Sequence, residues 1–288
     1  MDNIVVKTTT FRDHPGCKVL LEEMQDGRKH VRKSYGANNV SLNNVSLDDE
    51  EWDALCFLYN AGINVPEPYK KDEKGMYMQY IDNGMFWDSY EVADSNTQSN
   101  LADKFVKLLI DLHKIKPKSE PPLGGFIKNE LAEIKTIISK KQIDHYWDIL
   151  NKLESLSMDI NEYPSCYIHR DYHVWNVLSD KDRKLYIIDM TLTQGDYRFD
   201  VGWTYMLMSR SAIHDARFMD FAKEFLTKYC KNRPEAYDDI EYFKQLANLR
   251  WLVNVTPDKK TDKPWFPEMM DIAEQAIAEF LNRKERFI

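Results

Sequence analysis

The sequence predicts an α+β protein in which a small antiparallel sheet comes first and a larger helical part follows. Over the first 82 of the 288 residues, short segments with apolar residues in alternation are separated by turn residues, which is typical of strands. Later in the chain, apolar residues recur every three or four positions, which is typical of amphipathic helices. This length is enough for about two modules of ordinary size. We therefore expect one domain over residues 1–82 and a second over residues 83–288.

The composition excludes several classes of protein. The chain is 43% hydrophobic and 12% aromatic, which is enough for a full core and argues against disorder. Its four cysteines have no paired spacing, so a thiolate metal site is not expected. The net charge of −8 argues against a nucleic-acid partner and favours a small molecule with a positive charge. No apolar run approaches the roughly 20 residues that span a bilayer, and the N-terminus lacks a signal peptide, so we expect a cytoplasmic protein without a membrane partner.

The secondary structure can be assigned from periodicity and turn signals. The expected strands cover residues 5–10, 17–24, 28–35 and 76–81. The expected helices cover residues 47–61, 101–115, 127–139, 142–156, 201–208, 212–229, 238–254 and 267–283. Asp26-Gly27 is a hairpin signal, and Gly62 ends the first helix. Residues 11–16 and the proline-rich residues 116–125 are expected to be loops.

Three polar residues with a defined spacing lie in one segment, residues 167–203. Asp171 is followed five positions later by Asn176, and Asp189 ends an apolar run. A carboxylate can orient a hydroxyl and take its proton, while amide and carboxylate oxygens are suitable ligands for Mg²⁺. Phosphoryl transfer from a nucleotide to a hydroxyl requires this set of groups. The alternative is that Asp171 and Asn176 only cap turns, which is the commoner role of these residue types.

The local pattern suggests how Asn176 and Asp189 are brought together. Residues 166–168 and 185–188 are expected to be short strands, and residues 179–182 to form a turn between them. A hairpin of these two strands would place Asn176 and Asp189 side by side.

The same segment resembles the aminoglycoside phosphotransferase and choline kinase superfamily. Members share the pattern His-x-Asp-x-His-x-x-Asn, then Ile-Asp, then Gly-Asp-x-x-x-Asp. The matching residues here are His169, Asp171, His173, Asn176, Ile188, Asp189, Gly195, Asp196 and Asp200. The resemblance implies a two-lobed protein-kinase-like fold, with a small antiparallel-sheet N-terminal lobe and a larger helical C-terminal lobe. It also implies transfer of the γ-phosphate of ATP, with Mg²⁺, to a hydroxyl of a small molecule.

A protein kinase is a less suitable match, although His169-Arg170-Asp171 fits its catalytic loop. His173 stands where a protein kinase has lysine, and Asp189-Met190-Thr191 replaces Asp-Phe-Gly. Too few residues separate Asp189 from Asp196 for an activation loop, and no Ala-Pro-Glu follows.

The resemblance also assigns roles to residues of the first domain. Lys33 is expected to reach the α- and β-phosphates, with Arg32 as the alternative on the opposite face of the strand. Glu51 is expected to hold this lysine by an ion pair, with Glu50 as the competing choice. Residues 76–84 resemble the hinge between two kinase lobes. Backbone groups of Gln79 and Ile81 would there bind the adenine edge.

Asp171 is thus the expected catalytic residue, and Asn176 and Asp189 are the expected metal ligands. Asp200 is expected to cap the helix that it opens and to anchor the backbone of the catalytic loop. His169 is expected to bond neighbouring backbone. A zinc site of His169, Asp171 and His173 is the competing interpretation. A hydrolase with a serine nucleophile is excluded because no Gly-x-Ser-x-Gly turn is present.

Some features depart from the family pattern. Residues 11–16, where such kinases cover the phosphates, contain one glycine, and the chain has no Gly-x-Gly-x-x-Gly or Walker signature. Trp175 and Val174 replace the usual glycine and proline. These departures leave a second hypothesis open, a nucleotide-binding scaffold of kinase-like fold with little or no activity. The acceptor is also open: an aminoglycoside, choline, an amino sugar, homoserine or another small alcohol fits, and the acidity favours a cationic one. The oligomeric state is not indicated.

Overall fold

The computed structural model describes residues 4–14, 16–36, 47–117, 125–256 and 266–285. The chain divides into two compact units. The first unit contains Met1–Leu108 and Val174–Leu192, and the second contains Leu109–His173 and Thr193–Ile288. Two separate segments of the chain therefore form the first unit, and Asn176 and Asp189 lie in the second segment.

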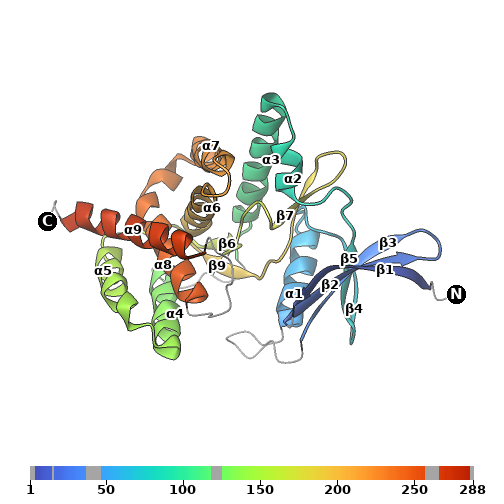
Figure 1. The fold of residues 1–288 in the computed structure, drawn as a ribbon, viewed down its shortest axis with the longest axis horizontal. Helices are drawn as coiled ribbons and strands as arrows, with labels where there is room; N and C mark the ends of the chain where they lie inside the picture. Colours follow the sequence, from blue (N-terminus) through green and yellow to red (C-terminus); the bar gives the residue numbers. More distant parts are fainter. Residues whose placement is uncertain (1–3, 15, 37–46, 118–124, 257–265, 286–288) are drawn as a thin grey trace. The chain divides into compact units, whose positions relative to one another are not determined.

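A five-stranded antiparallel sheet forms the centre of the first unit (Figure 1). The strands occur in the order β1-β2-β3-β5-β4. Their bounds are Val5–His14 for β1, Cys17–Met24 for β2, Lys29–Tyr35 for β3, Pro68–Asp72 for β4 and Gly75–Gln79 for β5. Strand β4 was not predicted, because Pro66 and Pro68 weaken its strand signal.

The first strand is longer than the sequence predicts. Residues 11–14, which were expected to be part of a loop, continue β1, and Asp13 pairs with Lys18 and His14 with Cys17. The loop was predicted because the alternation of apolar and polar residues stops after Thr10. The strand nevertheless continues, because an irregularity in its register between Thr10 and Arg12 accommodates the change. Phe11 therefore lies on a strand rather than in a loop.

Helices accompany the sheet in the first unit. Helix α1, Leu47–Asn60, matches the prediction closely and buries Ala54, Leu55 and Leu58 beside the sheet (Figure 1). Helix α2, Phe86–Glu91, was not predicted because it is only 6 residues long. Helix α3, Ser95–His113, begins earlier than expected and continues into the second unit. Asp94 explains the early start, since its carboxylate accepts from the backbone N–H of Thr97 at 3.0 Å.

A short hairpin completes the first unit and corrects one prediction. Strand β8, Leu185–Ile187, pairs with β7, Val177–Ser179, and not with residues 166–168. The turn between β7 and β8 lies where it was predicted, and Asp180 closes it by accepting from the backbone N–H of Lys184 at 2.8 Å. The sequence predicted the wrong partner because a three-residue strand directly before its turn has almost no periodicity of its own.

The second unit is mostly helical. Its elements are α4, Gly125–Lys141; η1, Asp144–Tyr146; α5, Trp147–Ser157; α6, Arg198–Ser211; α7, Arg217–Asn232; η2, Pro234–Tyr237; α8, Ile240–Val255; and α9, Phe266–Glu285. Strands β6, Cys166–Ile168, and β9, Thr193–Gly195, form an antiparallel pair. The core contains many fully buried aromatic residues, among them Tyr146, Tyr197, Phe199, Phe221, Phe225, Tyr229 and Phe243. The expected helices are all present here, with their ends shifted by a few residues.

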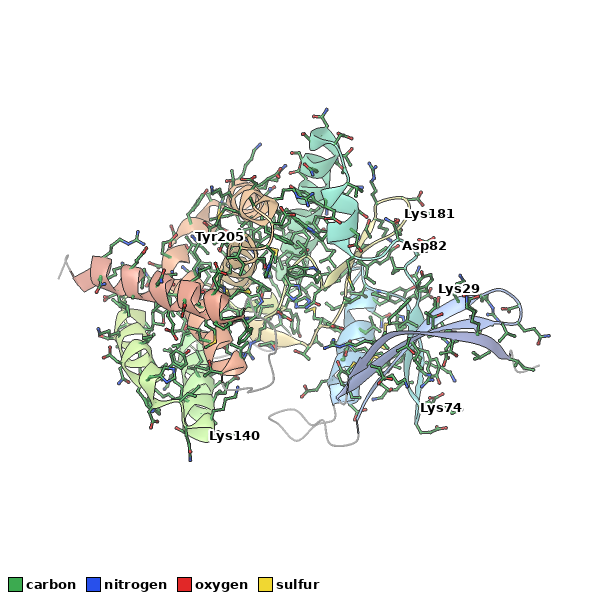
Figure 2. All side chains as sticks on the ribbon, in the orientation of Figure 1. Lys29, Lys74, Asp82, Lys140, Lys181 and Tyr205 are labelled. Atoms are coloured by element: carbon green, nitrogen blue, oxygen red, sulfur yellow. The ribbon has the colours of Figure 1, made fainter. Side chains whose placement is uncertain are left out.

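Charged side chains cover the outside of both units. In Figure 2 the labelled Lys74 and Lys181 extend outward from the β4–β5 and β7–β8 turns of the first unit. Within the part of the chain that the structure describes, no helix combines the length and apolar character needed to cross a bilayer. The sequence repeats Asn-Asn-Val-Ser-Leu at residues 38–42 and 43–47. All of this short repeat except residue 47 lies outside the described residues, as do residues 118–124 of the expected proline-rich loop.

The turn between β4 and β5 leads to a prediction about stability. Gly75 has a φ of 127°, and a Cβ atom there would lie 2.3 Å from the backbone oxygen of Lys33. We expect Gly75→Ala to lower the free energy of unfolding by about 2 kcal/mol or more, measured by urea denaturation. Gly27→Ala is the control, because Gly27 also has a positive φ but no atom within 4 Å of such a Cβ. It should cost only about 1 kcal/mol, and equal losses for the two variants would contradict the steric argument.

Candidate active site

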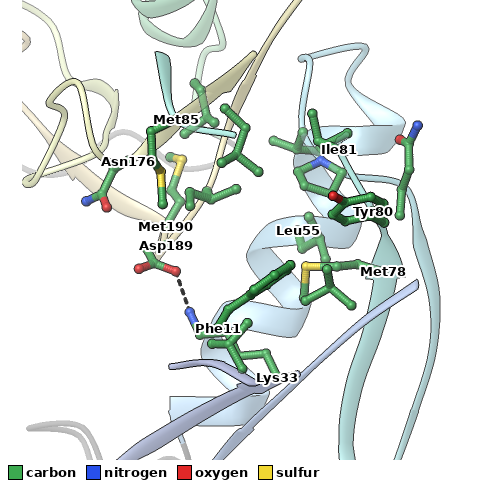
Figure 3. A pocket seen from close by; sticks show the side chains of 18 of the residues that line it. Phe11, Lys33, Leu55, Met78, Tyr80, Ile81, Met85, Asn176, Asp189 and Met190 are labelled. Carbon is green, nitrogen blue, oxygen red and sulfur yellow. Dashed lines mark hydrogen bonds and ion pairs between the residues drawn. The ribbon is translucent and has the colours of Figure 1, made fainter. Parts of the chain in front are cut away.

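The first unit contains a cavity of about 660 Å³ (Figure 3). Strands β1, β2, β3 and β5, helix α1 and the β7–β8 hairpin contribute to its wall. Its apolar lining includes Val31, Leu55, Leu58, Met78, Ile187 and Met190. Polar groups gather at one place in this wall, formed by Lys33, Glu51, Asn176 and Asp189. A cavity with apolar walls and a few convergent polar groups is the usual form of a small-molecule site.

An ion-pair network joins β3, α1 and the residue after β8. The Nζ of Lys33 lies 2.7 Å from Oε1 of Glu51 and 2.5 Å from Oδ1 of Asp189, and Figure 3 shows the second contact. Lys33 and Glu51 are 5% and 8% exposed, so this pair is shielded from solvent, whereas the side chain of Asp189 is 34% exposed. The ion pair that the sequence predicts between Lys33 and Glu51 is therefore present.

Burial and charge act against each other in this network. Burial tends to lower the pKa of Lys33, but the charges of Glu51 and Asp189 raise it well above its ordinary value. Burial raises the pKa of Glu51, and the charge of Lys33 offsets this only in part. The difference arises because Lys33 faces two carboxylates, whereas Glu51 faces one ammonium group. Lys33 is thus firmly charged, and Glu51 is the group that acid would neutralise.

Arg32 and Glu50, the alternatives to Lys33 and Glu51, lie outside the cavity wall. The Nε of Arg32 donates to Oε1 of Glu22 at 2.7 Å, on the other face of β3 from Lys33. Arg32 and Glu50 do not line the cavity, whereas Lys33 and Glu51 do.

Asn176 and Asp189 lie next to each other as expected, but across the β7–β8 hairpin and not across the hairpin that the sequence predicted. The backbone N–H of Ile188 donates to the carbonyl of Asn176 at 3.0 Å, and both Asn176 and Asp189 line the cavity (Figure 3). Asp189 has a φ of 57°, which is uncommon for a residue with a Cβ and is often found at functional sites. An amide and a carboxylate oxygen fit Mg²⁺, which usually takes one or two protein carboxylates and completes its shell with phosphates and water.

The expected hinge also borders the cavity. Gln79 and Ile81 both line it, and so does Tyr80 between them. The backbone N–H of Gln79 donates to the carbonyl of Glu67 at 2.9 Å. The backbone group that Gln79 offers to a base is therefore its carbonyl oxygen, as an acceptor. The sequence did not indicate Phe11, whose ring lies 6.2 Å from that of Tyr80 in a stacked orientation.

Asp171 belongs to the second unit and is held by a residue of α6. The indole N–H of Trp203 donates to Oδ1 of Asp171 at 2.9 Å, and Nε2 of His173 lies 3.3 Å from the same oxygen. The carboxylate of Asp171 is 49% exposed. The role of Trp203 was missed, since a tryptophan is by default a core residue and nothing in the sequence couples it to a position 32 residues earlier.

Asp200 anchors the backbone of the loop that carries Asp171. Its two carboxylate oxygens accept from the backbone N–H groups of His169 and Arg170, each at 2.7 Å. This confirms the expected anchor, but Asp200 is not a helix cap: α6 begins at Arg198, with no side-chain cap bond. His169 bonds neighbouring backbone as expected, by accepting from the N–H of Asp171 at 3.3 Å.

Two further groups support this loop. Arg170 has a φ of 65°, and its guanidinium lies 2.5 Å from Glu130 and 2.9 Å from Glu133 of α4. Nε2 of His113 lies 3.0 Å from Oδ2 of Asp200. Nδ1 of the same ring accepts from the hydroxyl of Tyr229 at 2.7 Å. The sequence showed neither connection, because each joins segments far apart in the chain.

Other groupings considered from the sequence are not supported. Among the described residues, no three His, Cys, Asp or Glu side chains are placed to share a metal ion, which gives the zinc interpretation no support. Asp196 binds the guanidinium of Arg198 at 2.7 Å, and both side chains are fully buried.

Comparisons with solved structures define the fold. An ethanolamine kinase from Plasmodium vivax is 14% identical, with a TM-score of 0.69 over 96% of this chain and 83% of that chain. A choline kinase from Streptococcus pneumoniae is 17% identical, with a TM-score of 0.66 over 96% of this chain and 94% of that chain. An ADP-bound aminoglycoside phosphotransferase is 17% identical, with a TM-score of 0.63 over 96% and 95% of the two chains. The fold is therefore that of the protein-kinase-like small-molecule kinases, as predicted.

The family follows from the sequence itself. Residues 49–242, more than half of the chain, match the model of the phosphotransferase enzyme family, and the chain belongs to that family. Membership in it makes the protein a member of a family of phosphotransferase enzymes. A sequence search of the curated proteins returned no significant match.

The anchor of Asp200 leads to a prediction about pH. Burial lowers the pKa of His113 below its ordinary value, although Asp200 opposes this shift. As pH falls below about 6.5, the unfolded chain takes up a proton at this position before the folded protein does, so folding stability falls. The contribution is at most about 1.4 kcal/mol per pH unit. We expect His113→Gln to reduce the slope of unfolding free energy against pH between about pH 5 and 6.5.

Urea denaturation at a series of pH values measures this slope. His214→Gln is the control, since His214 is exposed in the same unit. The same slope in the wild type and in His113→Gln would show that the buried ring does not cause the dependence.

Proposed function

We propose that this enzyme transfers the γ-phosphate of ATP to a hydroxyl of a small molecule in a Mg²⁺-dependent reaction. The observation that carries the proposal is the cavity of the first unit, where the Lys33–Glu51 pair, Asn176 and Asp189 meet apolar walls. The apolar part suits a purine ring, and Lys33 suits the phosphates. The ADP named in the description of one structural relative supports a nucleotide of this kind.

The chain's own residues divide the work as follows. Backbone groups of Gln79 and Ile81 bind the base, and Lys33, steadied by Glu51, binds the α- and β-phosphates. Asn176 and Asp189 hold Mg²⁺, which when bound neutralises the charge that develops on the phosphates. Asp171 orients the acceptor hydroxyl and takes its proton. Because phosphoryl transfer depends on positioning and on charge stabilisation, each of these contacts contributes to the rate.

A small cationic alcohol is the acceptor class that we favour. The net charge of −8 supports it, and so do the names of relatives that act on choline, ethanolamine and aminoglycosides. The test is a screen of small alcohols, charged and neutral, for phosphorylation that depends on ATP and Mg²⁺. Stabilisation of the protein by ATP only when Mg²⁺ is present would support the enzyme. Stabilisation that is independent of Mg²⁺, with no turnover, would instead support a nucleotide-binding scaffold.

Two aspartates should respond differently to the loss of charge. We expect Asp171→Asn to lower kcat by about 10³-fold or more while ATP–Mg²⁺ binding stays within about twofold, because the proton acceptor is lost and the nucleotide site is intact. Asp189→Asn should weaken the Mg²⁺-dependent part of ATP binding as well. Calorimetric titration and a phosphotransfer assay measure the two properties. Full turnover by Asp171→Asn would exclude this residue as the proton acceptor.

The bond from Trp203 to Asp171 gives a further expectation. Trp203→Phe keeps an aromatic ring but removes the donor, so Asp171 loses one of its orienting contacts. We expect kcat to fall about tenfold with little change in the KM for ATP. Trp147→Phe is the matched control, because its indole donates to Asp144 on the surface of the same unit, at 3.3 Å. An equal kcat in the two variants would show that the bond does not orient Asp171 for the reaction.

A further inference from the structure

Tyr35 completes the polar network of the cavity from a position that the family motif does not include. It lies on β3 two residues after Lys33, and side chains two apart on a strand point to the same face. Its hydroxyl donates to Oε2 of Glu51 at 2.5 Å, while Lys33 holds Oε1 at 2.7 Å. Both oxygens of Glu51 are thus bound by one strand.

The hydroxyl of Tyr35 stabilises the Glu51 carboxylate without adding a second positive charge. A carboxylate buried as deeply as Glu51 needs partners for its lone pairs, and Lys33 reaches only one oxygen. A phenol donates a hydrogen bond without bringing a charge, so it stabilises the ionised form without competing with Lys33 for the phosphates. The phenol itself stays protonated, because burial and the charge of Glu51 raise the pKa of Tyr35 far above neutral.

The contact also fixes a direction. Binding at Oε2 turns the other oxygen, Oε1, toward Lys33, so the rotamer of Glu51 is set from both sides. Lys33 divides its contacts between Glu51 and Asp189 in this structure. If Asp189 turns to Mg²⁺ when the nucleotide binds, Lys33 keeps only Glu51 as a partner. The orientation of Glu51 then decides where the ammonium group lies.

We propose that Tyr35 is a positioning residue for phosphoryl transfer, which acts by holding the Glu51 carboxylate toward Lys33. The inference rests on the proposed function, since it concerns how Lys33 is presented to the phosphates of ATP. The charged and titratable groups that face the network from the surrounding elements are Lys33 of β3, Asp189 after β8, Cys17 of β2 and Arg12 of β1. Burial raises the pKa of the Cys17 thiol, so it stays neutral in the range that the test covers.

The test measures Mg²⁺-dependent ATP hydrolysis, which needs no identified acceptor, in the wild type, Tyr35→Phe and Tyr69→Phe. Tyr69 is the matched control, because it is 50% exposed on β4 of the same sheet. We expect Tyr35→Phe to lower kcat/KM for ATP about tenfold at pH 7, which is the factor that a hydrogen bond to a charged group typically accounts for. Tyr69→Phe should match the wild type.

The pH profile separates positioning from a general loss of structure. Without the hydroxyl, Glu51 is protonated more easily, so the acid limb of kcat/KM should move to higher pH by about one unit in Tyr35→Phe. In a Glu51→Gln background the Tyr35→Phe change should have less than about a twofold effect, because its target is already neutral. An effect of the same size in both backgrounds would overturn the inference, as would an unshifted acid limb.

Other outcomes are equally decisive. If the wild type neither binds nor hydrolyses ATP, the proposed function fails, and this inference fails with it. If the wild type is active and Tyr35→Phe equals Tyr69→Phe, only the role of Tyr35 is overturned. Loss of the folded state in Tyr35→Phe while Glu51→Gln stays folded would also overturn it, because the hydroxyl would then support the sheet rather than Glu51.

Discussion

The burial of charge beside the cavity of about 660 Å³ is the constraint on which the first unit depends. Lys33 and Glu51 are both almost inaccessible to solvent, and their pair joins β3 to α1. A buried ion pair is weak evidence for stability, because two apolar side chains of similar volume often do as well or better. Its retention here is therefore explained better by the chemistry of the cavity than by folding. The sheet, the helix and the hairpin supply a frame in which an ammonium group stays charged away from water.

In the second unit, side chains from other elements hold the loop that carries Asp171. The loop before Val174 lies outside the helices and strands, and Asp200 accepts two backbone N–H groups from it. Glu130 and Glu133 hold Arg170 in the same loop, whose backbone is in an uncommon conformation. Side chains from α4 and α6 thus fix a segment that secondary structure alone would leave loose.

The sequence indicated candidate site residues, but not the residues that hold them in place. Spacing selected Asp171, Asn176 and Asp189 as candidates, because the residue types and their order follow from what a phosphate, a metal and a proton need, and their roles stay predictions. The Lys33–Glu51 pair could be predicted by resemblance, and the structure contains it. The wrong strand pairing for residues 185–188 shows a limit, since segments of three residues hold too little periodicity to choose a partner.

Contacts such as Trp203 to Asp171 and His113 to Asp200 could not be predicted from the sequence, for a different reason. They join residues 32 and 87 positions apart, and neither residue type signals its partner. A default assignment of tryptophan to the core is correct as far as it goes, because Trp203 is indeed buried. What the sequence does not reveal is which way its one polar atom points.

Three carboxylates, Glu51, Asp171 and Asp200, each receive a hydrogen bond from an uncharged aromatic side chain. Glu51 receives a bond from the phenol of Tyr35, and Asp171 receives one from the indole of Trp203. The third, Asp200, lies against His113, whose lowered pKa keeps the ring neutral, so that its proton must sit on the nitrogen that faces the acid. Each donor is aromatic, rigid and uncharged. A rigid donor fixes the direction of a carboxylate at little cost in side-chain entropy, and an uncharged one leaves the negative charge available to a lysine, a hydroxyl or a backbone N–H. Cations in these places would stabilise the acids more strongly, but they would neutralise the charge that the reaction needs.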